Sequence, residues 1–295
     1  MSQTIDSILV PTDGSEGARI GARRGIDLAA TTGADVHVLS VVDTREIEPS
    51  QASNEQTERE RLLEKDAEVA VDAISGLAKR HLPGRITTAV EEGIPFQTIN
   101  EYVDTHDIDL IVMGTQGRTG LERVLLGSVA EKTLRTATVP IVTVTPDADV
   151  AEVGDELYEN ILLPTDGSEG AELAIEWGIT LAEVYDAMVH TVYSVDTSRF
   201  GDEGRAEFYD ALEQTGREAL ETVRKRAREA DLSVAGTIAN GPAARAILSY
   251  SEEHDADLIV MGTHGRSGVR RYLIGSVTET VVRNADVPVC CVPMR

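Results

Sequence analysis

The chain repeats itself, and this duplication constrains its fold more than any other feature. Ile8–Ala18 (ILVPTDGSEGA) recurs as Ile161–Ala171 with one difference in eleven residues. Asp109–Arg118 recurs as Asp257–Arg266, and the two pairs of copies are 153 and 148 residues apart. This period is far longer than the roughly 20–50 residues of a solenoid repeat, so the duplication predicts two whole domains in tandem.

The length of 295 residues also fits two domains. We expect a first domain over residues 1–146, an acidic linker over 147–158 and a second domain over 159–295. The segment from Thr145 to Glu159 holds six acidic residues and no basic ones, which is typical of a solvated connection.

Short aliphatic runs alternate with helical patterns in each half, which predicts an α/β fold. In the first half, the expected strands are Ile8–Val10, Val36–Val42, Ile86–Val90, Leu110–Met113 and Val139–Val144. Leu110–Met113 has no polar alternation, as is typical of a strand covered on both faces, so the sheet should be parallel with helical crossovers. The fifth strands begin with Val139-Pro140 and Val287-Pro288, and proline favours a sheet edge. Because bare apolar edges aggregate, we expect these two strands to pair within the chain.

The chain is strongly acidic, with 51 Asp and Glu against 27 Lys and Arg and a net charge of −24. Such a surface repels nucleic-acid phosphates and anionic lipids, which argues against partners of either kind. Only four of the basic residues are lysine, a composition that indicates the cytoplasm of a halophile, where molar salt screens self-repulsion. No signal peptide and no long apolar run is evident, so we expect a cytoplasmic protein.

The adjacent Cys290 and Cys291 are expected to be small buried side chains.

Glycines follow the fourth expected strand of each half in one layout. Gly114-x-x-Gly117 is followed after nine residues by Gly127-Ser128, and Gly262, Gly265 and Gly275-Ser276 repeat this spacing. Free amides in such a loop, with the first amides of a helix that opens at the serine, form a concave anion site. The alternative is structural, because Ser128–Glu131 and Ser276–Glu279 both have the spacing of a capping box, in which the serine serves only its own helix.

Charge supports the anion site. Residues 113–135 hold four basic and two acidic residues, and residues 261–283 hold four and one, in a chain that is acidic overall. Arg118 and Arg266 lie inside the glycine loops and are the best candidates to reach an anion. Asp13 follows the first strand, where it either caps the next helix with Glu16 or faces the glycine loop and accepts hydrogen bonds from a ribose.

These residues resemble the universal stress protein family, and specifically its ATP-binding branch, over nearly the whole chain. The resemblance implies two tandem doubly wound domains, Rossmann-like and similar to the adenine nucleotide alpha hydrolases, each with a five-stranded parallel sheet, four helices and strand order 3-2-1-4-5. It also implies ATP, with Mg²⁺, as the ligand, and dimers paired through the fifth strands. The positions that match the family's ATP site are Pro11, Thr12, Asp13, Val41, Met113, Gly114, Gly117, Arg118, Gly127, Ser128 and Val129 in the first half, and Pro164, Thr165, Asp166, Met261, Gly262, Gly265, Arg266, Gly275, Ser276 and Val277 in the second. The second half departs from the first at Ser194, opposite Val41, and at His264, opposite Gln116.

Three functions remain open at this point. The favoured one is a stress-response or regulatory protein in which ATP, bound once per domain, tunes stability or partner association. An adenine-nucleotide enzyme such as a slow ATPase is the second, although no general base or dedicated lysine can be named, and we expect no enzyme. The third is an interaction protein whose loops are structural. The chain has no Gly-Lys pair, which excludes a P-loop, and its six histidines lack the spacing of a zinc site.

Overall fold

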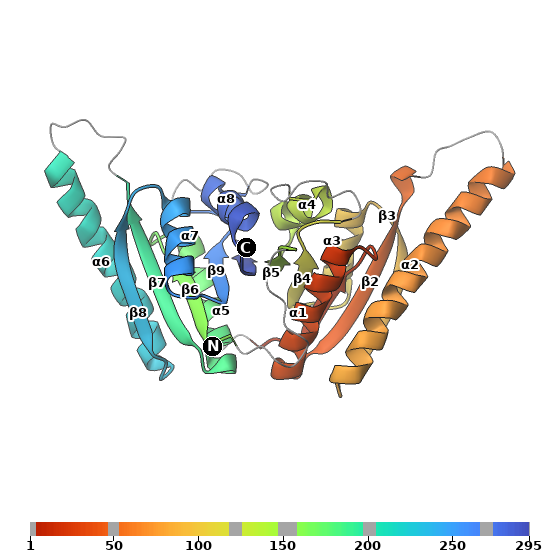
Figure 1. Cartoon of the computed structure of the whole chain (residues 1–295), viewed down its shortest axis with the longest axis horizontal. Helices are drawn as coiled ribbons and strands as arrows, with labels where there is room; N and C mark the ends of the chain where they lie inside the picture. Colours follow the sequence, from red (N-terminus) through yellow and green to blue (C-terminus); the bar gives the residue numbers. More distant parts are fainter. Residues whose placement is uncertain are drawn as a thin grey trace. The chain divides into compact units, whose positions relative to one another are not determined.

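The computed structural model describes residues 4–46, 53–117, 126–146, 158–196, 205–265 and 274–294. The chain divides into two compact units, residues 4–156 and residues 157–295, and we describe each unit by itself. The ribbon is shown in Figure 1.

The first unit alternates strands and helices along the chain. Its elements are β1 (Ser7–Pro11), α1 (Glu16–Thr32), β2 (Asp35–Asp43), the short 3-10 helix η1 (Thr44–Glu46), α2 (Ser53–His81), β3 (Ile86–Gly93), α3 (Pro95–Thr105), β4 (Leu110–Gly114), α4 (Ser128–Thr136) and β5 (Ile141–Val144). Every neighbouring pair is parallel, and the pairs give the order β3-β2-β1-β4-β5. The predicted α/β fold with a parallel sheet is therefore confirmed for this unit.

The second unit repeats the arrangement. It consists of β6 (Asn160–Pro164), α5 (Glu169–Tyr185), β7 (Met188–Val195), α6 (Arg205–Glu229), β8 (Val234–Asn240), α7 (Ala243–Glu253), β9 (Leu258–Gly262), α8 (Ser276–Asn284) and β10 (Val289–Val292). Its strands are also parallel, in the order β8-β7-β6-β9-β10.

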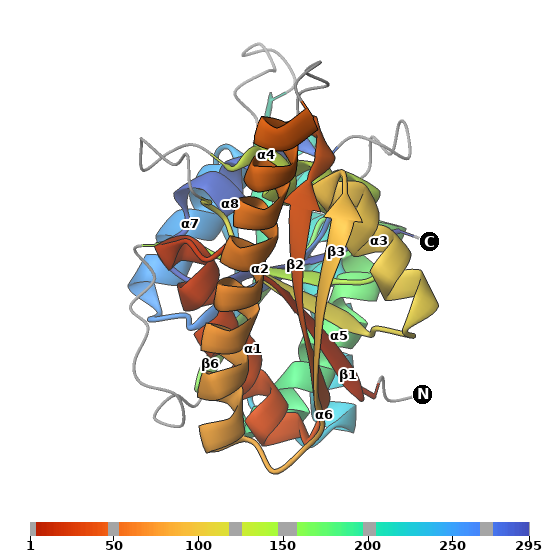
Figure 2. The ribbon, with the colours of Figure 1, turned by 90° about the vertical axis from the view of Figure 1, so that its right-hand side faces the viewer.

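In each unit the second and third strands are added on one side of the first strand, and the fourth and fifth strands are added on its other side. Right-handed crossovers then place α1 and α2 on one face of the sheet and α3 and α4 on the other. The contacts agree, since α2 packs along β2 and β3 and α3 packs on α4, and Figure 2 shows α2 beside those two strands. β1 and β4 flank the reversal, as the sequence interpretation required for Asp13 to face the glycine loop.

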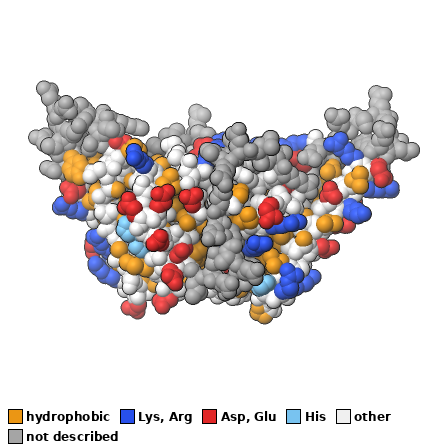
Figure 3. Space-filling model, viewed as in Figure 1, with side chains coloured by type: hydrophobic (Ala, Val, Ile, Leu, Met, Phe, Trp, Pro, Cys, Tyr) orange, Lys and Arg blue, Asp and Glu red, His pale blue; other side chains and the backbone are white. Residues whose placement is uncertain are grey.

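Burial explains why these segments form strands. Ile8, Leu9 and Val10 are fully buried in β1, and Leu110, Ile111 and Val112 are fully buried in β4, because helices cover both faces. Acidic side chains lie among basic and hydrophobic ones on the face shown in Figure 3. Among the described helices, none is long and apolar enough to cross a membrane.

The fifth strands start later than predicted. β5 begins at Ile141 and β10 at Val289, so Pro140 and Pro288 precede the strands instead of opening them. Each proline still takes part in the sheet through its carbonyl oxygen, which accepts a hydrogen bond from the amide of Ile111 or Ile259. A proline has no amide proton to donate, and at this position only its carbonyl oxygen takes part in a hydrogen bond.

One minor prediction about the second unit is confirmed. Cys290 and Cys291 are both buried and unpaired in β10, and burial raises the pKa of Cys290 to about 12, which keeps its thiol protonated. Trp177 is buried in α5 as a core residue.

Candidate functional site

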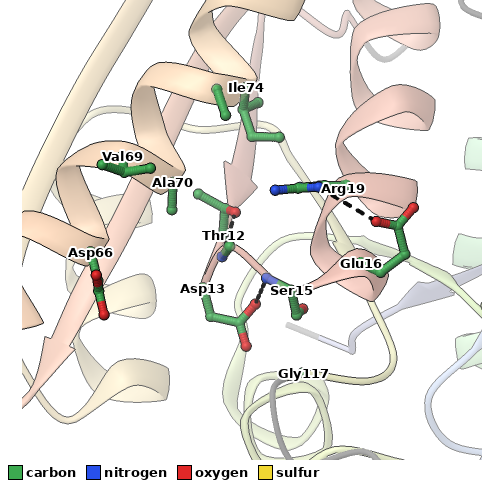
Figure 4. A pocket seen from close by; sticks show the side chains of 12 residues that line it. Thr12, Asp13, Ser15, Glu16, Arg19, Asp66, Val69, Ala70, Ile74 and Gly117 are labelled. Carbon is green, nitrogen blue, oxygen red and sulfur yellow. Dashed lines mark hydrogen bonds and ion pairs between the residues drawn. The ribbon is translucent and has the colours of Figure 1, made fainter.

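The turn between β1 and α1 is held by its own side chains. The Oγ of Ser15 accepts a hydrogen bond from the amide of Ala18 at 3.2 Å and is the N-cap of α1. Asp13 Oδ1 accepts from the amide of Ser15 at 3.0 Å, as the dashed line in Figure 4 marks. The alternative in which Asp13 caps the helix with Glu16 is therefore wrong, because Ser15 occupies the cap and Asp13 orders the turn before it.

The second unit builds the same turn between β6 and α5. Ser168 caps α5 by accepting from Ala171 at 3.3 Å, and Asp166 accepts from Ser168 at 3.0 Å. Gly14 and Gly167 both adopt positive φ, at 80° and 74°, which the sharp turn requires and glycine permits.

The loop after β4 is tied together at its two ends. The amide of Gly127 donates to the carbonyl of Thr115 at 2.7 Å, and Gly275 donates to Thr263 at 2.8 Å in the second unit. These hydrogen bonds occupy the amides of Gly127 and Gly275. Among the predicted site residues, these two glycines therefore close the loop and do not offer their own amides to a ligand.

The capping-box alternative for the serines is wrong. Gly127 is the N-cap of α4, Ser128 is its first residue, and no side chain in the described residues caps this end. Glu131 pairs with Arg135 at 2.6 Å. The same holds in α8, where Gly275 is the N-cap and Ser276 comes first. The first amides of each helix, at Ser128, Val129, Ser276 and Val277, consequently have no acceptor within their own helix.

The first turn and the glycine loop meet at Gly117. A Cβ on Gly117 would lie 2.6 Å from Asp13 Oδ2, and a Cβ on Gly265 would lie 2.6 Å from Asp166 Oδ2. The amide nitrogen of Gly117 lies 3.8 Å from the place of a Cβ on Gly127. The structure therefore brings the carboxylate, the loop backbone and the helix N-terminus close together, as expected, and glycine is needed where they approach.

A pocket of about 460 Å³ opens beside this meeting point in the first unit. Thr12, Asp13 and Gly117 line one side, Val69, Ala70 and Ile74 of α2 line another, and Arg19 of α1 reaches between them (Figure 4). Sequence reasoning missed Arg19 and the α2 wall. The sequence could have indicated Arg19, because it is a cation in the first turns of a helix, where the helix dipole disfavours positive charge.

The remaining predicted residues have different surroundings. Pro11 and Pro164 end β1 and β6, and Thr12 and Thr165 follow them, buried, with hydroxyls that accept from Gly14 and Gly167. Met113 and Met261 are buried in β4 and β9. Gly114 serves packing, because a Cβ there would lie 2.2 Å from the carbonyl oxygen of Gly17 in α1, and Gly262 meets Gly170 in the same way.

Two predicted positions on the second strands differ between the units. Val41 lies in β2, where it is partly exposed and paired with Glu91 of β3. Ser194, its counterpart in β7, donates its hydroxyl to the carbonyl of Gly241, so this hydroxyl serves the structure. Arg118 and Arg266 lie outside the described residues.

A second set of side chains, a His–Tyr–His cluster, recurs away from this crevice, where the second strand meets the third helix of each unit. His37 Nδ1 lies 3.0 Å from the hydroxyl of Tyr102, whose ring stacks on His106 at 3.8 Å. His190, Tyr250 and His254 repeat the cluster. Burial, and then the nearby His106 or His254, lowers the pKa of His37 and of His190. Within the described residues, no group of three or more His, Cys, Asp or Glu side chains could hold a metal ion.

Comparison with known proteins agrees with the duplicated architecture. The model of the universal stress protein family matches residues 4–145 and again residues 157–293. A universal stress protein of Methanocaldococcus jannaschii is 41% identical over 143 residues, which cover 47% of this chain and 84% of that protein. A universal stress protein of Archaeoglobus fulgidus has the same fold, with a TM-score of 0.70 over 98% of this chain and 97% of that one, at 21% identity. A universal stress protein of Mycobacterium tuberculosis is 29% identical over 196 residues, 63% of this chain and 62% of that protein. Since the family model matches twice and covers nearly all residues, the chain is a tandem member of the universal stress protein family.

Proposed function

We propose that this protein binds ATP in the crevice of each unit and acts as a regulator through nucleotide-dependent stability or partner association, in the cytoplasm. The observation that carries the proposal is the meeting of three groups at Gly117: the Asp13 carboxylate, the glycine loop and the N-terminus of α4. Neither a simple turn nor a capped helix requires these three groups to lie close together.

The helix N-terminus supplies the phosphate side of the proposed site. The amides of Ser128 and Val129 lack intrahelical acceptors, and the helix dipole adds partial positive charge at the same end. An anionic phosphate satisfies both requirements. The hydrogen bond between Gly127 and Thr115 joins the two ends of the loop beside this helix. Ser276 and Val277 supply the same groups in the second unit.

The carboxylates of Asp13 and Asp166 supply the sugar side. Each carboxylate uses Oδ1 in its own turn and directs Oδ2 toward the glycine loop. A carboxylate accepts hydrogen bonds from vicinal hydroxyls, which a ribose offers and a bare polyphosphate does not. Pro11 and Val41, at the ends of neighbouring strands, are the residues we assign to the adenine. Mg²⁺ would enter with the phosphates, since the described residues offer it no ligand cluster of their own.

A binding role fits these residues better than catalysis. Phosphoryl transfer needs a positioned base or water-orienting group together with metal-bound phosphates. The carboxylate nearest the crevice, Asp13, orders the β1–α1 turn and faces backbone. We therefore expect binding without significant phosphate release.

Titration calorimetry on the full chain tests the proposal with three ligands: Mg-ATP, 2′,3′-dideoxy-ATP and inorganic tripolyphosphate. We expect ATP to bind most tightly, and dideoxy-ATP to bind about tenfold or more weakly, because it loses hydrogen bonds to a charged acceptor worth roughly 1.5–3 kcal/mol. If tripolyphosphate bound as tightly as ATP, the site would recognise anions in general and not a nucleotide. Absence of binding by all three ligands would refute the proposal.

A further inference from the structure

The two crevices share their backbone but differ in side chains, and the difference concerns charge. We propose that the first unit binds the nucleotide at least about tenfold more tightly than the second, because Arg19 places a positive charge beside its crevice where the second unit has Glu172. This inference rests on the proposed function and specifies how that function is divided between the units.

Arg19 and Glu172 occupy the same place in the fold. Each lies four residues after the serine that caps its helix, and each donates its amide to that serine's carbonyl, at 3.1 Å from Arg19 to Ser15 and 3.0 Å from Glu172 to Ser168. Both side chains are exposed. They therefore project from the same turn of equivalent helices, and the difference between them is one of charge.

The charge of Arg19 belongs to the pocket. Arg19 lines it together with Asp13 and Gly117, the residues that mark the proposed phosphate and sugar sides (Figure 4). Its guanidinium pairs with Glu16 at 3.7 Å, and its side chain remains 54% exposed. An anion entering the crevice therefore meets a cation that a surface pair holds only weakly.

The helix dipole does not favour Arg19. A cation near the N-terminus of a helix is opposed by the helix dipole, whereas an acidic residue there is favoured. The second unit follows this preference, since Glu169 and Glu172 both lie in the first turns of α5. The first unit departs from it at the residue that lines the pocket, and binding of an anion gives a reason for the departure.

The helix wall opposite this turn differs in where its acidic residue lies and not in its total charge. Ala70 and Ile74 are buried on α2 as Ala219 and Val223 are on α6, and this alignment sets Glu218 opposite Val69. Val69 lines the pocket of the first unit with an exposed apolar side chain, whereas Glu218 is exposed and acidic. Asp66 also lines this wall of the first unit, and the same alignment sets Thr215 opposite it, so the two walls carry one acidic residue each and the charge difference rests on Arg19 and Glu172.

The space between the second strand and the second helix is also filled differently. Tyr193 of β7 is buried against α6, in the place that Ser40 occupies in β2. Its ring lies 2.7 Å from the place of a Cβ on Gly216, so only glycine fits the helix there. The corresponding helix position in the first unit is Ala67, a larger residue beside a smaller strand partner.

Exchange of the two charges tests the inference. Arg19→Glu and Glu172→Arg are made singly in the full chain, and Arg85→Glu is the matched control, since it makes the same charge change where β3 begins, at the opposite end of the strands. Mg-ATP is titrated by calorimetry at fixed salt, and circular dichroism confirms folding of each variant. We expect two classes of site in the wild type. Arg19→Glu should weaken the tight class about tenfold and Glu172→Arg should strengthen the weak class about tenfold, equivalent to about 1.4 kcal/mol, while Arg85→Glu changes neither.

The outcomes separate this inference from the proposed function. Two equal sites in the wild type, or a tight site that is insensitive to Arg19→Glu, would overturn the inference while ATP binding stands. Equal sites would also mean that Arg270, which the second glycine loop has where the first has Glu122, compensates for Glu172. If the wild type binds no nucleotide, the proposed function itself fails.

Discussion

Replacement of Ser128 by proline removes one candidate phosphate donor while leaving the helix able to form. Ser128 is the first residue of α4, a position where proline is favoured because the amide there has no intrahelical acceptor. The preceding Gly127 has φ −60° and ψ 144°, the extended conformation that a following proline demands. We therefore expect Ser128→Pro to change the free energy of unfolding by less than about 1 kcal/mol.

The same substitution should have a large effect on binding. A hydrogen bond to a charged group contributes roughly 1.5–3 kcal/mol, so the loss of one amide–phosphate bond should weaken ATP binding in the first unit by about 10- to 150-fold. Ser128→Ala is the control, because it removes the hydroxyl and keeps the amide. Ser276→Pro provides the equivalent test in α8, where Gly275 has φ −61° and ψ 142°.

Calorimetric titration of Mg-ATP into the full chain measures these effects, with urea denaturation of each variant as the stability check. The reasoning predicts that Ser128→Ala retains most of the affinity that Ser128→Pro loses. If both proline variants bind ATP as tightly as the wild type while remaining folded, the helix amides do not hold the phosphates and the site must lie elsewhere.

Further expectations concern stability. Saturation with ATP at a hundred times its dissociation constant should add about 2.7 kcal/mol to the free energy of unfolding, seen as a rise in the thermal midpoint, and an unmoved midpoint contradicts binding to the native state. The pKa of His37 and of His190 is lower in the folded protein, so the unfolded chain binds more protons as the pH falls below about 6.5, and stability should decline there. His37→Gln with His190→Gln should flatten this decline in urea titrations at pH 7.5 and 5.5, whereas the exposed control His81→Gln should not. Gly76→Ala in α2 has no atom within 4 Å of the new methyl group and should stabilise the chain by roughly 0.5–1 kcal/mol. Gly17→Ala would place its methyl 2.1 Å from the carbonyl oxygen of Gln116 and should cost about 1–3 kcal/mol or more, and denaturation curves that rank these two variants equally would contradict the packing argument.

Much of the fold could be predicted because it depends on local patterns. The duplication required two copies of one domain, and runs such as Leu110–Met113, apolar at every position, required strands covered on both faces. The turn at Asp13 and the glycine loop could also be located, since glycine and the short polar residues report the backbone conformations they permit. These features are encoded within a few neighbouring residues.

The roles within the crevice could not be read in this way. Ser128 had the spacing of a capping residue, but Gly127 is the cap, because it is extended at φ −60° and ψ 144° and its carbonyl accepts the first helical hydrogen bond, from Glu131. The amide of Gly127 is also taken, by Thr115, which lies twelve positions away. Gly114 looked like part of the ligand loop, and its Cβ position turned out to be occupied by the backbone of α1.

Sequence alone thus determined two α/β domains, each with an aspartate after its first strand and a glycine loop after its fourth, because periodicity and turn chemistry are local properties of the chain. Only the tertiary structure decided that the amide of Gly127 is taken by Thr115 and that Arg19 and Val69 share a pocket with Asp13. The physical reason is that these relations arise where α1, α2 and the loop after β4 converge, and contacts between segments so far apart in the chain leave no periodic trace within any one of them.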